Sequence, residues 1–276
     1  MMYNDYDEDE INHIKEVELM ILKDFIEICD NNDIEYYLIY GTQIGAIRHQ
    51  GFIPWDDDID VILFREDYEK FLKVMEENPN EKYTIFDPRY DNEYCFEFGR
   101  MSLNGTYWAE YWDKHVSFKL GIHIDLFILD NLPDNKLKRW LFIQRCYILT
   151  RLYPIAVFKF DNYSAPVNFA LNLAHKLFRT FGFGPKYFEK RLYNVFTKYN
   201  SNSGEYVTDL TLIERPAFKR TDYKPPKKAL FEGIEMNVPN SDYNTLTPIY
   251  GDTYMQLPPE EERVNHVLNE IDFGKY

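Results

Sequence analysis

Apolar residues recur at two different spacings along this chain, and the spacing predicts which segments are helices and which are strands. Recurrence every three or four residues among charged positions predicts an amphipathic helix, whereas alternating or unbroken apolar runs predict strands. The helices predicted in this way span residues 8–32, 43–48, 65–78, 136–151, 164–181, 185–200, 240–250 and 260–270. The predicted strands span residues 36–40, 58–64, 83–86, 94–101, 118–129, 206–213 and 229–238. Both ends of the chain therefore mix helices and strands, while the middle is helical.

Glycine and capping residues mark several of these boundaries. Gly41 ends the first strand, and Thr42 is the expected cap of the short helix that follows it. Gly251 is the expected C-terminal stop of helix 240–250.

The helical middle of the chain differs from the rest in charge. Residues 136–198 hold twelve Lys and Arg against Asp161 and Glu189, a net of +10, so the remainder of a chain with net charge −15 carries −25. This basic segment is a candidate for peripheral contact with an anionic membrane, near a lipid-linked glycan acceptor. It could instead steer an anionic acceptor. A simpler interpretation is that the helices pack over the core and their lysines are solvated.

Composition excludes several classes of protein. The chain has 276 residues, 45% of them hydrophobic and 17% aromatic, which is enough for a full core. A net charge of −15 argues against general nucleic-acid binding. Three widely separated cysteines, Cys29, Cys95 and Cys146, fit reduced thiols rather than a disulfide or zinc framework. The N-terminus shows no secretory pattern and no apolar run reaches about 18 residues, so we expect a cytoplasmic protein, free or peripheral on the inner membrane face.

Candidate catalytic and metal-binding residues are most concentrated in the stretch from Tyr40 to Leu63, YGTQIGAIRHQGFIPWDDDIDVIL. Four aspartates (Asp56, Asp57, Asp58 and Asp60) directly precede an apolar run. Like charges at close range repel and raise each other's pKa, and a bound cation removes that cost. The alternative is a solvated acidic loop in front of a strand.

Strand alternation selects two of the four aspartates. In an extended strand, Asp58 and Asp60 point the same way with Cα atoms roughly 6–7 Å apart, whereas Asp57 points to the opposite face. A third carboxylate, Asp125, lies between Ile124 and Leu126 in strand 118–129 and needs a partner. If the two strands are adjacent, Asp58, Asp60 and Asp125 form an oxygen-only site, which favours Mg²⁺, or Mn²⁺, over zinc.

Such a site suits transfer at phosphorus. A metal held by carboxylates neutralises phosphate oxygens and orients the leaving group, and a carboxylate not fully engaged by the metal, Asp60 or Asp125, accepts the proton of the attacking hydroxyl. The sequence does not choose between these two bases.

Other candidate substrate-binding residues surround the aspartates. Gly41 and Thr42 lie between a strand and a helix, where free N–H groups bind phosphate, although a purely structural turn has the same pattern. Arg48 and His49 are candidate phosphate ligands or general acids, or else an exposed basic helix end. Arg100 is predicted to be a buried guanidinium that needs an anion, from the protein or from substrate. His123 is either a residue that orients a ligand carboxylate or a satisfied core histidine.

Two long motifs then carry a resemblance to a known family. GTQIGAIRH followed by GFIPWDDDIDV, and the later FEG…VP…YGDTYMQLPPEEERVNH, resemble the LicD family of phosphocholine transferases, which in turn resembles fukutin and fukutin-related protein around the first motif. The resemblance spans roughly residues 10–125 and 229–268. It implies an α+β fold, a nucleotidyltransferase-like (polymerase β-type) core with a mixed sheet. The family's Gly-Thr turn, Asp-x-Asp strand and third carboxylate then fall on Gly41-Thr42, Asp58 with Asp60, and Asp125.

The resemblance also implies a function. Members transfer a phospho-alcohol, commonly phosphocholine from CDP-choline and in related members ribitol phosphate, to a hydroxyl of a cell-surface glycan of the teichoic acid, lipopolysaccharide or capsule type. We therefore expect a Mg²⁺-dependent phosphotransferase. Two alternatives are a nucleotidyltransferase that attaches a nucleoside monophosphate to a small molecule or protein, and a non-enzymatic glycan-binding module. The expected domains are residues 1–132 and 204–276, which together form the core, and residues 133–203, a basic helical insertion.

A choline substrate gives the aromatic residues near the motif a second use. Aromatic faces bind quaternary ammonium groups through cation–π contact, although core packing is their commoner role. The candidates are Tyr40, Trp55, Tyr107, Trp108, Tyr111 and Trp112. Trp55, within the motif itself, joins Gly41, Thr42, Arg48, His49 and Arg100 as an expected substrate-binding residue.

Overall fold

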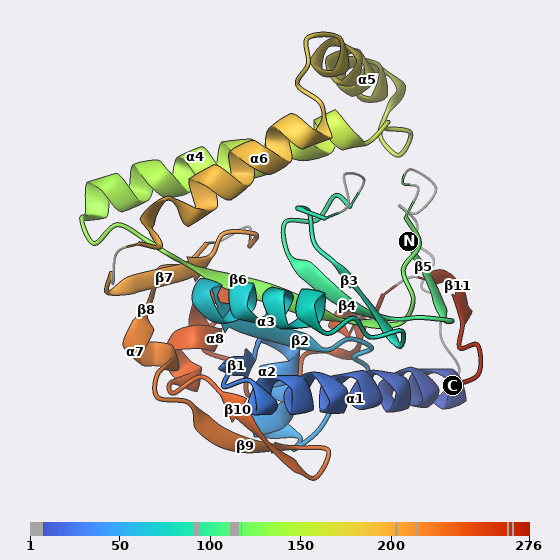
Figure 1. Cartoon of the computed structure of the whole chain (residues 1–276), viewed down its shortest axis with the longest axis vertical. Helices are drawn as coiled ribbons and strands as arrows, with labels where there is room; N and C mark the ends of the chain where they lie inside the picture. The colour runs from blue at the N-terminus through green and yellow to red at the C-terminus, as the bar shows by residue number, and fades with distance from the viewer. Residues whose placement is uncertain are drawn as a thin grey trace.

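A curled mixed β-sheet forms the centre of the molecule (Figure 1). The computed structural model describes residues 8–90, 94–110, 116, 118–201, 204–212, 215–263, 265–266 and 268–276. The sheet contains β1 (Tyr36–Leu38), β2 (Asp60–Phe64), β3 (Tyr83–Phe86), β4 (Gly99–Leu103), β6 (His123–Asn131), β7 (Tyr206–Asp209) and β8 (Phe218–Lys219). Its order is β1-β2-β6-β4-β3, with β7 paired to β6 and β8 to β7. Only the β2–β6 pair among these is parallel.

The long strand β6 organises this sheet. β2 lies along one edge of β6, while β4 and then β7 share the other edge, pairing with its first and last residues respectively. β2 is buried at every position because the sheet is covered on both faces. This double coverage explains why its sequence, DVILF, is apolar on both faces after the first residue.

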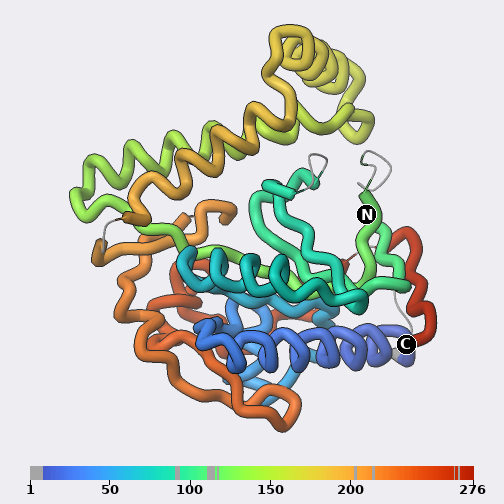
Figure 2. The backbone as a smooth tube through the Cα atoms, in the orientation of Figure 1, coloured from blue at the N-terminus to red at the C-terminus, as the bar shows by residue number. Residues whose placement is uncertain are grey.

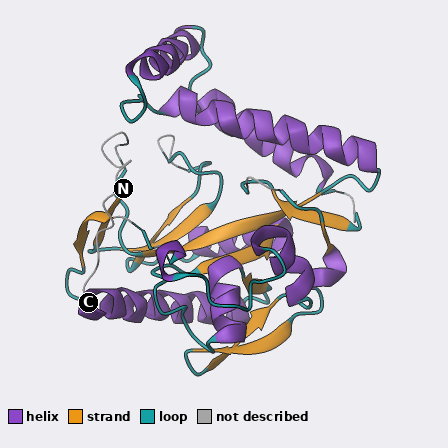
Figure 3. Ribbon diagram, turned by 180° about the vertical axis from the view of Figure 1, so that it is seen from behind, coloured by secondary structure: helices purple, strands orange, loops and turns teal. Residues whose placement is uncertain are grey.

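Two long helices cover one face of the sheet, and short helices cover the other. α1 (Glu8–Asn31) and α3 (Arg65–Glu77) pack on the first face, where Val61, Leu63 and Leu126 join a large core cluster (Figure 1). α2 (Tyr40–Arg48), α7 (Arg220–Tyr223) and α8 (Asp242–Tyr250) contribute to the apolar cluster on the second face, seen from behind in Figure 3.

Two small two-stranded sheets complete the core. β9 (Lys227–Phe231) pairs with β10 (Ile234–Val238), and β11 (Leu268–Asp272) pairs with β5 (Tyr107–Glu110). The C-terminal segment therefore returns beside the middle of the chain, as the tube in Figure 2 shows.

The basic middle of the chain forms a separate helical block. It consists of α4 (Lys136–Val157), α5 (Ala165–Thr180) and α6 (Pro185–Phe196), followed by a 3₁₀ turn over Thr197–Tyr199. Asn135 caps α4, because its side chain accepts hydrogen bonds from the N–H groups of Leu137 and Lys138. α4 and α6 share an apolar cluster of their own, whereas α5 has no buried residue. In Figure 1 this block lies at the top, with α5 farthest from the sheet.

Much of the expected secondary structure is confirmed, including the α+β class, the long N-terminal helix and the three basic helices. The three cysteines lie buried in three different apolar clusters, as expected for thiols that form no disulfide. None of the helices in the described part of the chain combines the length and apolar character that a membrane crossing requires.

Several boundaries were wrong. The strands predicted to begin at residues 94 and 118 begin at Gly99 and His123, and residues 229–238 form a two-stranded hairpin rather than one strand. Residue 213, predicted to end a strand, lies outside the described residues. The predicted helix 260–270 is instead a 3₁₀ turn over Glu260–Glu262 followed by strand β11. Its apparent helical spacing is overridden by pairing with β5, a contact distant in sequence.

Candidate functional site

Two aspartates predicted to meet do lie side by side at the start of β2 and β6. Asp60 is in register with Asp125 across the parallel pair, and neighbouring residues in register point to the same face. The Asp60 N–H donates to Thr42 Oγ1 at 2.8 Å, and the Asp125 N–H donates to the Ile59 carbonyl at 2.9 Å. Backbone pairing therefore fixes the position of both carboxylates before any ligand binds.

The loop before β2 adds more carboxylates than the alternation argument expected. β2 begins at Asp60, so Asp58 lies in the loop, and the prediction that residues 58–64 form one strand was wrong. Asp56, Asp57 and Asp58 each place a carboxylate oxygen within 4.8 Å of the others. A loop is not bound by strand alternation, which explains why Asp57 does not simply point away.

His266 supplies a cation to this acidic loop. Its backbone N–H and its Nδ1 lie 3.1 and 3.0 Å from the Asp57 carboxylate. Burial alone would lower the pKa of His266, but the hydrogen bond to Asp57 and the charge of Asp58 raise it to about 10. Sequence reasoning had no signal for His266, because 209 residues separate it from Asp57.

Burial and the neighbouring carboxylates raise the pKa values of the aspartates. Burial, followed by the charges of Asp58 and Asp125, raises the pKa of Asp60 well above its usual range. Burial also raises the pKa of Asp58, although His266 opposes the shift, and burial with the charge of Asp58 raises that of Asp56. Raised pKa values in a cluster of buried carboxylates favour the binding of a cation there.

A further carboxylate, Glu18 of α1, was not predicted. Glu18 is 2% exposed, and its Oε2 has no hydrogen-bond partner among the described residues. Burial, then the charges of Asp58 and Asp57, raises its pKa well above the usual range. With Asp58 and Asp125 it lines a cavity of about 10 Å³, room for one water-sized species.

The sequence did hold a signal for Glu18. It occupies the apolar face of α1, at i+4 from Ile14 and three residues before Ile21, where a charge is out of place. A buried carboxylate without a partner is unfavourable and needs an explanation.

Gly41 and Thr42 act on the loop and strand rather than as a helix cap. α2 begins at Tyr40, so the prediction that Thr42 caps the helix was wrong. A Cβ on Gly41 would lie 2.7 Å from Asp56 Oδ2, so a larger residue there would displace the Asp56 carboxylate. Tyr40 itself has φ +52°, a strained value for a tyrosine, and its hydroxyl donates to Asp209 at 2.8 Å.

Arg100 and His123 complete the wall beside Asp125. Arg100 Nε donates to Asp125 Oδ1 at 2.8 Å, and the guanidinium lies 4.4 Å from the Phe96 ring centre. The anion predicted for Arg100 is therefore a protein carboxylate in this structure. The His123 Nδ1 lies 2.9 Å from the Gly121 carbonyl, and burial, followed by the charge of Arg100, lowers its pKa to about 3. His123 is thus a neutral, satisfied core histidine.

Arg48 and His49 lie at the end of α2 and hold the C-terminal segment. Arg48 Nη1 donates to the carbonyls of Tyr254 and Gln256, both at 2.9 Å, and its Nε contacts His49. Burial, and then the charge of Arg48, lowers the pKa of His49. Arg48 and Trp55 both line a cavity of about 440 Å³, whose other wall includes Tyr250 and Tyr254.

The candidate aromatic residues that the structure describes are not gathered in one cage. The Tyr40 hydroxyl contacts Asp209, Trp108 is buried against His123 and His266, and Lys119 lies over Tyr107. Trp55 lines the 440 Å³ cavity, and Arg263 lies 4.8 Å from its ring centre. Tyr111 and Trp112 lie outside the described residues.

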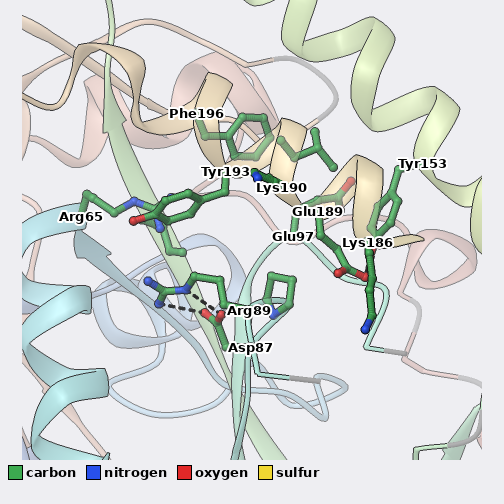
Figure 4. Close-up of a pocket in the computed structure, with 13 residues that line it drawn as sticks. Arg65, Asp87, Arg89, Glu97, Tyr153, Lys186, Glu189, Lys190, Tyr193 and Phe196 are labelled. Atoms are coloured by element: carbon green, nitrogen blue, oxygen red, sulfur yellow. Dashed lines mark hydrogen bonds and ion pairs between the residues drawn. The ribbon is translucent and has the colours of Figure 1, made fainter. Parts of the chain in front are cut away.

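A second cavity, of about 320 Å³, lies at the seam between α6 and the core (Figure 4). From α6, Lys186, Glu189, Lys190 and Tyr193 face it at intervals of one helical turn. The core side includes two fixed arginines: Arg65 donates twice to Asp130 at 2.8 Å, and Arg89 donates to Asp87 at 2.8 Å. Burial raises the pKa of Glu97, also in the wall, to about 7.

A mixed sheet with aspartates side by side on adjacent parallel strands is an arrangement suited to binding a cation or a phosphate group. Comparison with known proteins narrows the class of protein. Residues 33–167 match the model of the LicD/FKTN/FKRP family, nucleotidyltransferase domain. Over 266 residues the chain is 30% identical to lipopolysaccharide cholinephosphotransferase LicD of Haemophilus influenzae, an alignment that covers 91% of this chain and 94% of that protein. It is also 38% identical over 142 residues to an uncharacterized protein of Rickettsia typhi, covering 51% of this chain and 38% of that one.

The chain therefore belongs to the LicD family. The resemblance seen in the sequence is confirmed, and with it the general class, an enzyme that transfers phosphate-containing groups.

Proposed function

We propose that this protein transfers phosphocholine from CDP-choline to a hydroxyl of a cell-surface glycan of the lipopolysaccharide type. The observation that carries the proposal is the in-register pair Asp60 and Asp125, with Asp58 in the adjoining loop. Family membership and the activity named for the Haemophilus relative support the choice of phosphocholine and of a lipopolysaccharide acceptor.

We further propose that Asp58, Asp60 and Asp125 hold Mg²⁺, with Mn²⁺ as the alternative. The donors are of the right kind, because they are carboxylate oxygens. Asp60 is in register with Asp125, and Asp58 and Asp125 line one small cavity with the buried Glu18, whose Oε2 has no hydrogen-bond partner among the described residues. The carboxylates that lie within 4.8 Å of one another in the described part of the chain are those of Asp56, Asp57 and Asp58, so Asp58 is common to that group and to the proposed set. When bound, the metal would neutralise phosphate oxygens of the donor. Asp57, already engaged by His266, would support the loop rather than bind the ion.

The transfer needs a base for the acceptor hydroxyl. The acceptor oxygen forms a bond to the phosphorus of phosphocholine, the bond to the CMP oxygen breaks, and the hydroxyl proton goes to a carboxylate. We assign this role to Asp60, because Asp125 accepts a hydrogen bond from Arg100. The Asp60 carboxylate has no hydrogen-bond donor among the described residues. Arg100 would keep Asp125 oriented.

We assign the donor to the 440 Å³ cavity. It lies next to the acidic loop, since Trp55 directly precedes Asp56, and both family motifs contribute to its wall. Trp55, Tyr250 and Tyr254 offer aromatic faces suited to a quaternary ammonium group.

We assign the acceptor glycan to the seam cavity (Figure 4). Tyr193 offers a ring for sugar stacking, Glu189 accepts hydroxyl hydrogen bonds, and Lys186 and Lys190 have no ion-pair partner among the described residues. Two such lysines favour a saccharide that carries phosphate or carboxylate groups.

The domain division also remains our proposal, namely a nucleotidyltransferase-like core of residues 1–132 and 204–276 with residues 133–203 inserted. It is supported by the direct pairing of β7 with the end of β6, which makes the core continuous across the helical block.

One assay separates the three functions considered. The protein is incubated with Mg²⁺, CDP-choline and lipopolysaccharide, and the expected products are CMP and phosphocholine-modified glycan. Release of diphosphate from a nucleoside triphosphate, with no CMP from CDP-choline, would instead identify a nucleotidyltransferase. Glycan binding with no turnover of either donor would identify a binding module.

A further inference from the structure

The helix α5 exposes an apolar face that no other part of the described chain covers. None of its 16 residues is buried. Phe169, Leu173 and Leu177 follow one another at four-residue intervals, so they form one stripe, and they are 71%, 47% and 47% exposed. A continuous apolar stripe in water is unfavourable and marks an interaction surface.

α4 carries a second apolar stripe on its outer side. Leu137, Trp140, Leu141 and Ile148 are more than half exposed. Helical geometry places them opposite Phe142, Cys146 and Tyr153, which pack in the cluster shared with α6. The stripe on α4 therefore faces away from the apolar cluster that α4 shares with α6. Figure 1 shows α5 beyond one end of α4, farthest from the sheet.

The charge of these two helices indicates what covers them. α4 and α5 contain seven Lys and Arg and no Asp or Glu, in a chain whose net charge is −15. A second copy of the chain would bring like charges together on this face. An anionic surface would be attracted to it, and a basic amphipathic helix with Trp and Phe on its apolar side is typical of the membrane interface.

We propose that the outer face of α4 and α5 docks on an anionic lipid bilayer, with the apolar stripes in the headgroup region and the lysines and arginines against lipid phosphates. The lipid requirement is negative headgroup charge rather than one particular headgroup. Docking goes beyond the proposed transfer reaction and does not depend on it. It would hold the enzyme at the surface where membrane-linked glycans are found.

The test is co-sedimentation of the full chain with vesicles of phosphatidylcholine alone and of phosphatidylcholine with 30% phosphatidylglycerol. The variant removes one apolar and one basic residue from α5, Leu173→Gln with Lys176→Gln. The matched control makes the same pair of changes on β9, Leu230→Gln with Lys228→Gln. Leu230 is 43% exposed, close to the 47% of Leu173, so both doubles alter equally accessible positions.

We expect the wild type to bind the anionic vesicles at least about tenfold more tightly than the neutral ones, with binding weakened by salt. The α5 variant should lose at least about tenfold in affinity, because it removes one leucine from the apolar stripe and one lysine that contacts lipid phosphates. The β9 variant should bind like the wild type.

Three outcomes would overturn the proposal. These are equal binding to neutral and anionic vesicles, unchanged binding of the α5 variant, and concentration-dependent self-association that the α5 variant abolishes without any vesicle binding. The last result would assign the face to a second copy of the chain. CMP release from CDP-choline by both variants, measured without membranes, reports separately on the transfer reaction.

Discussion

The acidic site and the basic helical block differ in how their charges are placed: the carboxylates are buried close together, whereas the basic residues are spread over exposed helices. At the site, Asp56, Asp58, Asp60 and Glu18 lie close together, and burial, together with their mutual repulsion, raises their pKa values. In the helical block, like charges are spread over exposed helices, where solvent screens them, and the unfavourable feature is exposed apolar surface. The first region therefore favours binding of a cation, and the second exposes an apolar surface that no other part of the described chain covers.

The largest effect should come from the site. Asp58→Asn preserves size but removes one charge from the proposed metal set, and we expect CMP release from CDP-choline to fall by roughly 10³-fold or more, together with Mn²⁺ affinity. Turnover is measured by CMP release and Mn²⁺ binding by electron paramagnetic resonance. The β9 double variant serves as the control. If Asp58→Asn released CMP at the wild-type rate, Asp58 would have no role in the transfer reaction.

The seam between the two regions should depend on a buried ion pair. Arg65→Met leaves Asp130, whose side chain is 1% exposed, without its bidentate partner, and we expect a loss of about 3 kcal/mol in the free energy of unfolding. The matched control is Lys73→Met on the same helix, since Lys73 forms an exposed pair with Glu77 and should change stability by less than about 0.5 kcal/mol. Urea unfolding measures both. If both variants lost a similar free energy of unfolding, the buried Arg65–Asp130 pair would contribute no more to stability than an exposed pair.

A smaller effect of opposite sign is expected at Glu18. Glu18→Gln removes a buried carboxylate without a partner, so the metal-free protein should gain about 1–2 kcal/mol of stability. If Glu18 also contributes to the cation site, Mn²⁺ affinity should fall about tenfold in the same variant. Thermal unfolding in EDTA and Mn²⁺ titration give the two readouts.

The control for Glu18 is Glu16→Gln, an exposed position on the same helix, which should alter neither quantity. A destabilised Glu18→Gln variant in EDTA would contradict the prediction, because it would mean that the carboxylate makes a favourable contact.

The smallest effect concerns the acceptor. Lys186→Gln with Lys190→Gln should raise the KM for a phosphorylated glycan acceptor by roughly threefold to tenfold and leave the KM for CDP-choline unchanged, because exposed lysine–anion contacts are individually weak. Steady-state kinetics with each substrate varied in turn measures this split. Lys198→Gln, an exposed position just beyond α6, is the control, and an equal rise in both KM values would argue against an acceptor site at the seam.

The sequence predicted the parts of the fold that depend on local pattern. Apolar periodicity identified α1, α3 and the three basic helices, and a single motif identified Asp58 and Asp60. It did not predict β11, because that strand depends on β5, about 160 residues earlier. The apolar spacing over 260–270 predicted a helix, but pairing with β5 makes residues 268–272 a strand.

The sequence by itself determined which chemical groups are available: a carboxylate cluster, a third carboxylate in an apolar strand and a basic helical segment. Only the tertiary structure decided which groups meet. Parallel pairing of β2 with β6 set Asp60 beside Asp125, β4 brought Arg100 to Asp125, and the returning C-terminus brought His266 to Asp57. The reason is physical: periodicity records the environment of each residue along its own element, whereas the partner of a buried charge is set by contacts between distant elements.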